Sequence, residues 1–258
     1  MMQDSDSTRS TGAQRNGVQS IARAAAVLRA LGAAPEGLAL GELAAAVALP
    51  KSTVHRLVQA LAAEDLARAP AGGRIRLGPG LARLGAAAQD ALADTLRLPL
   101  QDLRRELDET ADLAVLDGAG VRFIDQAPAP HRLRAVSAVG STFPLHCTAN
   151  GKALLAALGD DAVRDLLPAR LPRFTAATIT ARDALLADLA RVRRTGVAVD
   201  REEHTDGICA VAAAICDADG PVAAFSVPVP TQRFRGNERR YGAAVRAAAD
   251  RASLLLAG

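Results

Sequence analysis

The order of three helical segments and a hairpin in the first 80 residues constrains this sequence more than any other feature. Apolar residues recur at helical spacing from Val18 to Leu31, and Ser20 is the expected N-cap. Two further helices are predicted over 41–47 and 51–63. Only Ala48-Leu49-Pro50 separates them, and a connection of this length sets the second helix across the first. The pattern predicts a helix-turn-helix.

A short hairpin is predicted after the third helix. Its strands cover 66–69 and 74–77, and the glycines of the intervening Pro70-Ala71-Gly72-Gly73 allow the positive φ that a tight turn needs. A hairpin here forms the wing of a winged helix-turn-helix. Helical periodicity returns over 80–97 as a linker helix, and Pro99 marks the entry to a new segment.

The third helix has an apolar and a polar side. Its apolar stripe is Val54, Leu57, Val58 and Leu61. Its outward side chains are Lys51, Ser52, Thr53, His55, Arg56 and Gln59. Such a helix fits the major groove, where Arg56 suits a bidentate contact to guanine and Gln59 a contact to adenine. In the wing, Arg74 and Arg76 are expected to neutralise phosphates or enter a minor groove.

The charge distribution agrees with duplex DNA as the partner. Between Gly17 and Arg83 there are eight cationic and four anionic side chains, whereas the whole chain has a net charge of only +3. One module therefore carries the basic excess. The alternative is a helical protein-interaction domain whose polar face is simply solvated.

The remaining chain alternates helices and strands. Helices are predicted over 100–109, 148–158, 162–167, from a Thr180/Asp183 capping box to Gly196, and over 238–256. Strands are predicted over 113–116, 121–125, 133–136, 197–200, 210–216 and 222–229, with hairpin turns at 117–120 and 217–220. This order predicts an α+β domain with an antiparallel sheet flanked by helices. Residues 1–16 are polar and are expected to be a disordered leader.

Composition excludes several classes of protein. With one Tyr and no Trp the chain lacks the stacking platform of a single-strand binder. No apolar run is long enough to span a membrane and no signal peptide precedes the folded part, so we expect a cytoplasmic protein. Three cysteines without CxxC spacing predict free thiols, and we expect no metal and no cofactor.

Two clusters outside the helix-turn-helix carry reactive side chains. His146 and Cys147 are adjacent, but neighbours in an extended chain point to opposite sides, which favours pocket lining or packing over a nucleophile with its base. The charged run 201–206 is interpreted as a solvated loop or as the edge of a ligand pocket. One His and loosely spaced carboxylates do not define a metal site.

Several segments together resemble the IclR family of transcriptional regulators, over about Val18 to Arg233. They are Val18-Gln19-Ser20-Ile21, the stretch 49–57, Arg76-Leu77-Gly78-Pro79, the stretch 144–155, Arg173-Phe174-Thr175 and the stretch 200–208. The resemblance implies a winged helix-turn-helix (17–79), a linker helix (80–97) and a GAF-like α/β effector-binding domain (98–258). It also implies homodimers or tetramers on a pseudo-palindromic operator, and effectors that are small organic or aromatic acids.

The resemblance also implies where the effector binds. A carboxylate-binding relative uses positions that correspond to Asn150, Gly151, Asp200, Ala210, Ser226 and Pro228, and Cys147 is added as a lining residue. Because Ala210 and Pro228 lack the polar side chains of that relative, a different or less polar ligand is expected. The helix start near Asn150 still favours a carboxylate. Two alternatives stay open: a small-metabolite enzyme in the second domain, and a constitutive DNA binder with a vestigial pocket.

Overall fold

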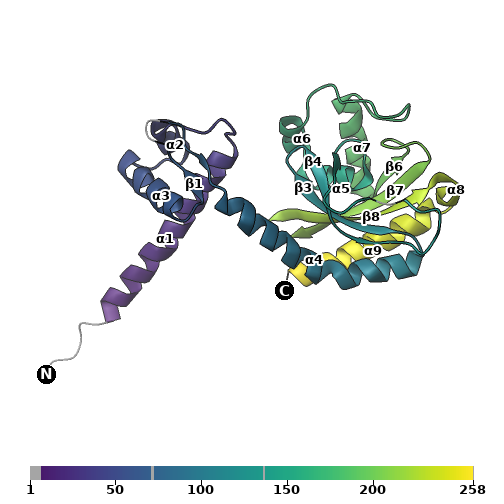
Figure 1. Cartoon of the computed structure of the whole chain (residues 1–258), viewed down its shortest axis with the longest axis horizontal. Coiled ribbons are helices and arrows are strands. Elements are labelled where there is room, and N and C mark those ends of the chain that lie inside the picture. The colour runs from purple at the N-terminus through teal and green to yellow at the C-terminus, as the bar shows by residue number, and fades with distance from the viewer. Residues whose placement is uncertain (1–6, 71–72, 136, 258) are drawn as a thin grey trace. The chain divides into compact units, whose positions relative to one another are not determined.

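The computed structural model describes residues 7–70, 73–135 and 137–257. It divides into two compact units, and the division falls between Ala88 and Gln89. The elements of both units are labelled in Figure 1. The predicted two-domain α+β fold is confirmed.

The first unit is a winged helix-turn-helix, as predicted. Its elements are α1 (Ser7–Gly32), α2 (Leu40–Ala46), α3 (Lys51–Ala63), β1 (Ala67–Arg68) and β2 (Arg76–Leu77). The two strands pair antiparallel, and Leu38 adds one bridge to Ile75. The three helices and the wing share one core, whose buried members include Val27, Leu31, Leu43, Val54 and Val58. The predicted wing turn lies partly outside the described residues, at 71–72.

Helix α1 begins earlier than expected. It starts at Ser7, so Ser20 lies inside the helix and the prediction of Ser20 as N-cap is wrong. Residues 7–16, expected to be disordered, are helical, whereas 1–6 lie outside the described residues. No proline interrupts 7–32, so the helix anchored by its buried C-terminal half continues upstream.

The second unit is a three-layer domain built on one antiparallel sheet. Its helices are α4 (Gly80–Leu107, which starts in the first unit), α5 (Ala149–Leu158), α6 (Asp160–Leu166), α7 (Arg182–Thr195), α8 (Thr231–Phe234) and α9 (Glu238–Leu256). Its strands are β3 (Ala111–Asp117), β4 (Gly120–Ala127), β5 (Thr142–Pro144), β6 (Ala198–Arg201), β7 (Ile208–Asp217) and β8 (Gly220–Pro230). They lie in the order β5-β4-β3-β8-β7-β6. Figure 1 shows α9 and the end of α4 on one face and α5 on the other.

Alternation along the strands gives each face its own core. On β8, Phe225 and Val227 point to the α4/α9 side, whereas Ala224 points to the α5/α7 side. The hairpin turns at 117–120 and 217–220 are confirmed by the pairs Asp117–Gly120 and Asp217–Gly220. The small residues on the α5 side leave room for a cavity at one end of the sheet.

Helix α4 passes through Pro99, where a break was predicted. A proline inside a helix removes one backbone hydrogen bond and costs about 3 kcal/mol. Leu96, Leu100 and Leu103 flank this position and are at most 1% exposed in the α4/α9 core. Burying each of three leucines contributes about 2 kcal/mol, so packing on the sheet outweighs the proline.

Two other local predictions are wrong. Residues 133–135 form no strand, and Val136 lies outside the described residues. The edge strand is instead β5, at Thr142–Pro144. Helix α7 begins after Ala181 without a side-chain cap, so Thr180 and Asp183 form no capping box. Its predicted end is confirmed, because Gly196 takes φ 72° as a left-handed C-cap.

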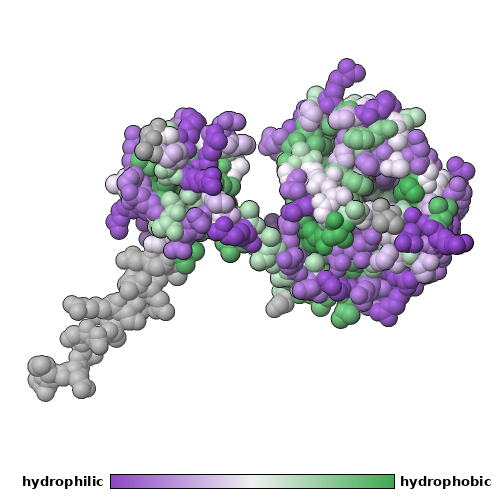
Figure 2. Space-filling model, in the orientation of Figure 1, coloured by the Kyte–Doolittle hydropathy of each residue, from purple (hydrophilic) through white to green (hydrophobic). Residues whose placement is uncertain are grey.

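In the part of the chain that the structure describes, no helix is long and apolar enough to cross a membrane. Figure 2 shows hydrophilic residues over most of the visible face of each unit.

Candidate functional site

The polar face of α3 is exposed. Val54 and Val58 are buried against α1 and α2, which turns the opposite side of the helix to solvent. Of the six residues predicted to contact DNA on α3, Thr53 is half-buried and the following are exposed: Lys51, Ser52, His55, Arg56 and Gln59. Across residues 7–70, 73–135 and 137–257, neither Lys51 nor Arg56 has an acidic side chain within ion-pair distance. Both cations are therefore available to an external anion.

The two wing arginines are held by the first unit itself. Arg74 pairs with Glu42 at 2.8 Å and donates from Nε to the carbonyl of Gly37 at 2.9 Å. Arg76 approaches Glu36 at 3.5 Å. Sequence reasoning placed both on the wing but could not show these partners, which neutralise part of their charge.

Arg68 is the wing cation that sequence reasoning missed. It lies on β1 directly opposite Arg76 and is exposed. No ion pair with another described residue occupies it. Since the guanidinium of Arg76 is drawn toward Glu36, Arg68 is the freer partner for a phosphate.

A cavity of about 310 Å³ lies at one end of the sheet in the second unit, on the α5 face. The register of the strands assembles it: Asp200 on β6 lies opposite Ala210 on β7, which lies opposite Pro228 on β8. Ser226, two residues from Pro228, lies on the same face. Four predicted effector residues from three strands thus line one cavity.

Asn150, in the first turn of α5, also lines the cavity. Its Oδ1 accepts from the amide of Gly151, whereas its buried Nδ2 has no hydrogen-bond partner among the residues described. The side chain is only 2% exposed. The first amides of a helix lack intrahelical acceptors as well. This end of the cavity therefore offers unsatisfied donors.

Gly151 and Cys147, also predicted, do not line the cavity. A Cβ on Gly151 would lie 2.3 Å from the carbonyl oxygen of Leu145, so this glycine allows α5 to pack closely on the preceding chain. Cys147 is fully buried, and burial raises the pKa of its thiol to about 12. The neighbouring His146 bonds the carbonyl of Pro172 through Nε2, and burial lowers its pKa. This thiol is a packing group, protonated at neutral pH.

Aromatic rings, which sequence reasoning did not assign to the site, form one wall. Phe123 and Phe143 line the cavity with ring centroids 5.1 Å apart, edge to face. The ring of His204 stacks on that of Phe143 at a centroid distance of 4.5 Å, and the ring of Phe174 stacks on His204 at 5.2 Å. The protein has only five Phe residues, so three of them gather here. Such a wall suits a planar ring.

The charged run 201–206 is divided between the cavity and the core. His204 and Thr205 line the cavity, as the pocket-edge interpretation expects. Glu203 points inward and accepts from Lys152 Nζ at 2.6 Å. Lys152 is 1% exposed and also contacts Asp188 at 3.1 Å, so a buried ion cluster joins α5, α7 and this loop. Among the described residues, no group of His, Cys, Asp and Glu could hold a metal ion.

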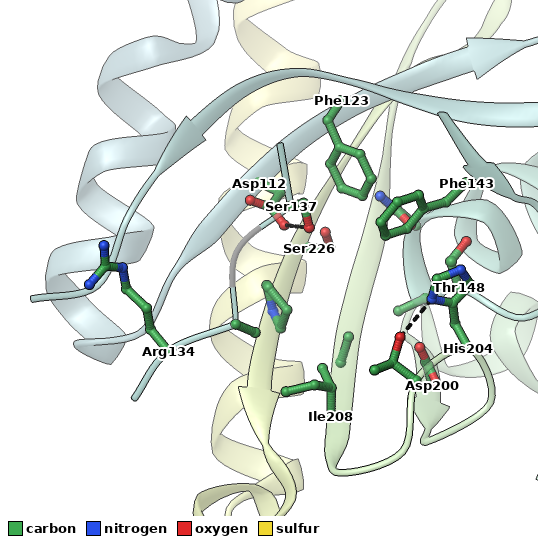
Figure 3. Close-up of a pocket in the computed structure, with 16 residues that line it drawn as sticks. Asp112, Phe123, Arg134, Ser137, Phe143, Thr148, Asp200, His204, Ile208 and Ser226 are labelled. Atoms are coloured by element: carbon green, nitrogen blue, oxygen red, sulfur yellow. Dashed lines mark hydrogen bonds between the residues drawn. The ribbon is translucent and has the colours of Figure 1, made fainter. Parts of the chain in front are cut away.

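Two buried carboxyl groups border the cavity. Burial raises the pKa of Asp200 to about 7, helped by the nearby negative charge of Glu203. Burial also raises the pKa of Asp112 on β3 to about 7, although Gln126 and Ser137 donate to it. Sequence reasoning missed Asp112 because it lies within an otherwise apolar strand. Figure 3 shows the two carboxyl groups on opposite sides of the pocket, with Phe123 and Phe143 along its upper edge.

Comparisons with known proteins agree with this arrangement. Residues 20–70 match the IclR helix-turn-helix domain, and residues 86–254 match the bacterial transcriptional regulator IclR C-terminal domain. The HTH-type transcriptional regulator Rv1719 of Mycobacterium tuberculosis is 49% identical over 230 residues, which are 89% of each chain.

Solved structures share the fold. The crystal structure of the Thermotoga maritima IclR superposes with a TM-score of 0.63 at 25% identity, covering 93% of this chain and 100% of that one. An IclR homologue from Microbacterium hydrocarbonoxydans was solved in complex with 4-hydroxybenzoate. It superposes with a TM-score of 0.61 at 23% identity, covering 92% of this chain and 98% of that one. With a winged helix-turn-helix followed by the matching C-terminal domain, the chain belongs to the IclR family of DNA-binding transcriptional regulators.

Proposed function

We propose that this regulator reads a pseudo-palindromic operator as a homodimer or a dimer of dimers, in the cytoplasm, and that a small aromatic or organic acid controls it. In this proposal residues 17–79 bind DNA, 80–97 form the linker and 98–258 bind the effector. The observation that carries the DNA-binding part is the exposed, cationic side of α3, on which Lys51 and Arg56 have no acidic partner among the described residues.

The effector part is supported by the cavity. Its volume of about 310 Å³ falls in the range of small-molecule sites. The Nδ2 of Asn150 and the first amides of α5 suit a carboxylate, and Phe123 and Phe143 suit a ring. The homologue solved with 4-hydroxybenzoate has the same fold and a ligand of that chemistry.

Operator binding is tested by selecting a duplex from a random library and measuring affinity by fluorescence anisotropy. We expect Arg56→Ala to weaken binding roughly 10- to 100-fold, since a bidentate contact to guanine contributes about 1–3 kcal/mol. Arg164→Ala, an exposed arginine of the second unit, is the control. Unchanged affinity in R56A would remove this residue from recognition. Failure to select any duplex would contradict operator binding.

Effector control is tested by thermal shift with a panel of aromatic and aliphatic acids, followed by anisotropy on the selected duplex. A ligand that binds only the native protein raises its melting temperature. The expected result is a stabilising acid that also changes DNA affinity. Stabilisation without any change in DNA affinity would contradict control of DNA binding, and absence of any hit would favour a constitutive binder.

A further inference from the structure

The cavity contains a buried acid whose position suggests a role in choosing the ligand. Asp112 lies on β3 opposite Ser226 on β8, at the side of the cavity away from Asp200. It is 0% exposed. No cationic side chain in the described part of the chain lies within ion-pair distance of it. Buried carboxylates are normally paired, so the missing partner needs an explanation.

The contacts of Asp112 leave acceptor capacity unused. Its Oδ1 accepts from Gln126 Nε2 at 2.7 Å and its Oδ2 from Ser137 Oγ at 2.9 Å. Two carboxylate oxygens provide about four lone-pair positions, so about two of them have no side-chain donor among the described residues. Gln126 also donates to the carbonyl of Ser137 at 2.6 Å, which fixes the orientation of the group. Asp112 is therefore a rigid acceptor at the cavity wall.

Apart from Ser137, none of the described lining residues donates a side-chain hydrogen bond to Asp112. Arg134 is the cationic side chain in the lining, and its guanidinium donates to the carbonyl of His131 at the exposed rim. A second ligand carboxylate beside Asp112 would place two like charges in a desolvated site. A hydroxyl group there would donate to a carboxylate, which is among the stronger hydrogen bonds.

We propose that Asp112 is a specificity-determining residue, which selects ring compounds that carry a hydroxyl on the side away from the start of α5. This inference rests on the proposed effector function and deepens it. The cavity then binds a ligand at both ends, with Asn150 facing the acid group, the Phe123 and Phe143 wall facing the ring, and Asp112 accepting from the hydroxyl.

Asp112 could instead only hold the segment around Ser137 against β4. The two roles predict different ratios between the affinity for a ligand with the hydroxyl and the affinity for a ligand without it. A structural role would weaken all ligands alike when Asp112 is changed, whereas an accepting role changes the preference for a hydroxyl and leaves ligands without a donor nearly unaffected.

The experiment is calorimetry of the full-length protein with 4-hydroxybenzoate, benzoate and 4-methoxybenzoate at one fixed pH of about 8, above the pKa of Asp112, so that this carboxyl is ionised. A hydrogen bond to a charged group contributes about 1.5–3 kcal/mol, so we expect 4-hydroxybenzoate to bind tenfold or more tightly than the other two. Asp112→Asn should reduce this preference to about threefold or less, since the charge assistance is lost. Ser137→Ala, which removes a neighbour of Asp112 but not the acceptor, should keep the preference.

Equal affinities for the three compounds, or an unchanged preference in D112N, would overturn the inference. Phenol and benzyl alcohol carry a hydroxyl but no acid group, so their binding tests the role of Asp112 separately from the proposed acid effector. If they bind and the acids do not, the acid effector is wrong and Asp112 retains its role, provided that D112N weakens them. If no ring compound binds, the inference fails, whereas DNA binding is judged separately by the duplex selection.

Discussion

Arg233 and Glu109, 124 residues apart in sequence, form a two-point ion pair. Nε and one terminal nitrogen of Arg233 donate to the two carboxylate oxygens of Glu109 at 2.5 and 2.8 Å. Glu109 is only 3% exposed, and Arg233 also donates to the carbonyl of Leu133. The pair thus connects α8, the chain just after α4, and the segment that leads to the cavity residues Arg134 and Ala135.

Arg233→Ala should destabilise the second unit. The change leaves the buried carboxylate of Glu109 without its partner, and breaking such a pair costs about 3 kcal/mol. Urea denaturation followed by circular dichroism measures the loss. Arg239→Ala on α9 is the control, because this arginine is exposed. Equal midpoints for the two variants would show that the pair contributes no stability.

The wing arginines should differ in their contribution to DNA binding. Arg68→Ala removes an exposed cation without an acidic partner among the described residues, so we expect weaker binding to all duplexes and a salt slope smaller by about 1. Arg74→Ala should have a smaller effect, since Glu42 already neutralises that charge. Anisotropy at several salt concentrations measures both. A larger change in slope for R74A than for R68A would reverse this ranking.

Gly151→Ala should disturb the start of α5. The new Cβ would lie 2.3 Å from the carbonyl oxygen and 2.6 Å from the Cα of Leu145, so the backbone must move. We expect a loss of about 1–3 kcal/mol of unfolding free energy and weaker acid binding, because Asn150 moves with the helix.

The matched control is Gly85→Ala in α4, where no described atom lies within 4 Å of the new Cβ. It should stabilise by up to about 1 kcal/mol through helix propensity. If melting curves place G151A level with G85A, close packing at Gly151 has no energetic importance.

Acid binding should depend on pH through Asp200. With its pKa raised to about 7, chiefly by burial and then by Glu203, this carboxyl gains a proton as pH falls through neutrality. The ionised form repels a ligand carboxylate, whereas the protonated form donates to it. A benzoic acid remains ionised in this range, so benzoate affinity should rise as pH falls from about 8 to about 6, by at most about tenfold per unit.

Lys152 and Glu203 lie near Asp200 as well, and burial lowers the pKa of His204. Asp112, on the other side of the cavity, also has a pKa raised to about 7. Asp200→Asn isolates the effect, and calorimetry at several pH values should show most of the slope lost in that variant. An affinity that falls toward low pH in the unchanged protein would contradict a carboxylate next to Asp200.

Local signals along the chain determined most of the fold. The apolar stripe around Val54 defined α3 and its outward residues, since helix periodicity is a property of neighbouring residues. The turns at Gly118 and Gly220 were equally predictable, because tight turns need particular residues at positive φ. Asn150 and Asp200 were predicted as effector-site residues because their segments resemble those of a known family.

Tertiary structure alone decided the features that depend on distant partners. Pro99 is tolerated because the sheet buries the leucines around it, and Arg74 is held because α2 places Glu42 beside it. Asp112 borders the cavity only because β3 pairs with both β4 and β8. Periodicity along the sequence shows which face of a helix or strand is apolar. The neighbours of a buried polar group, in contrast, depend on the order of the strands in the sheet, which residues far apart in the chain determine together.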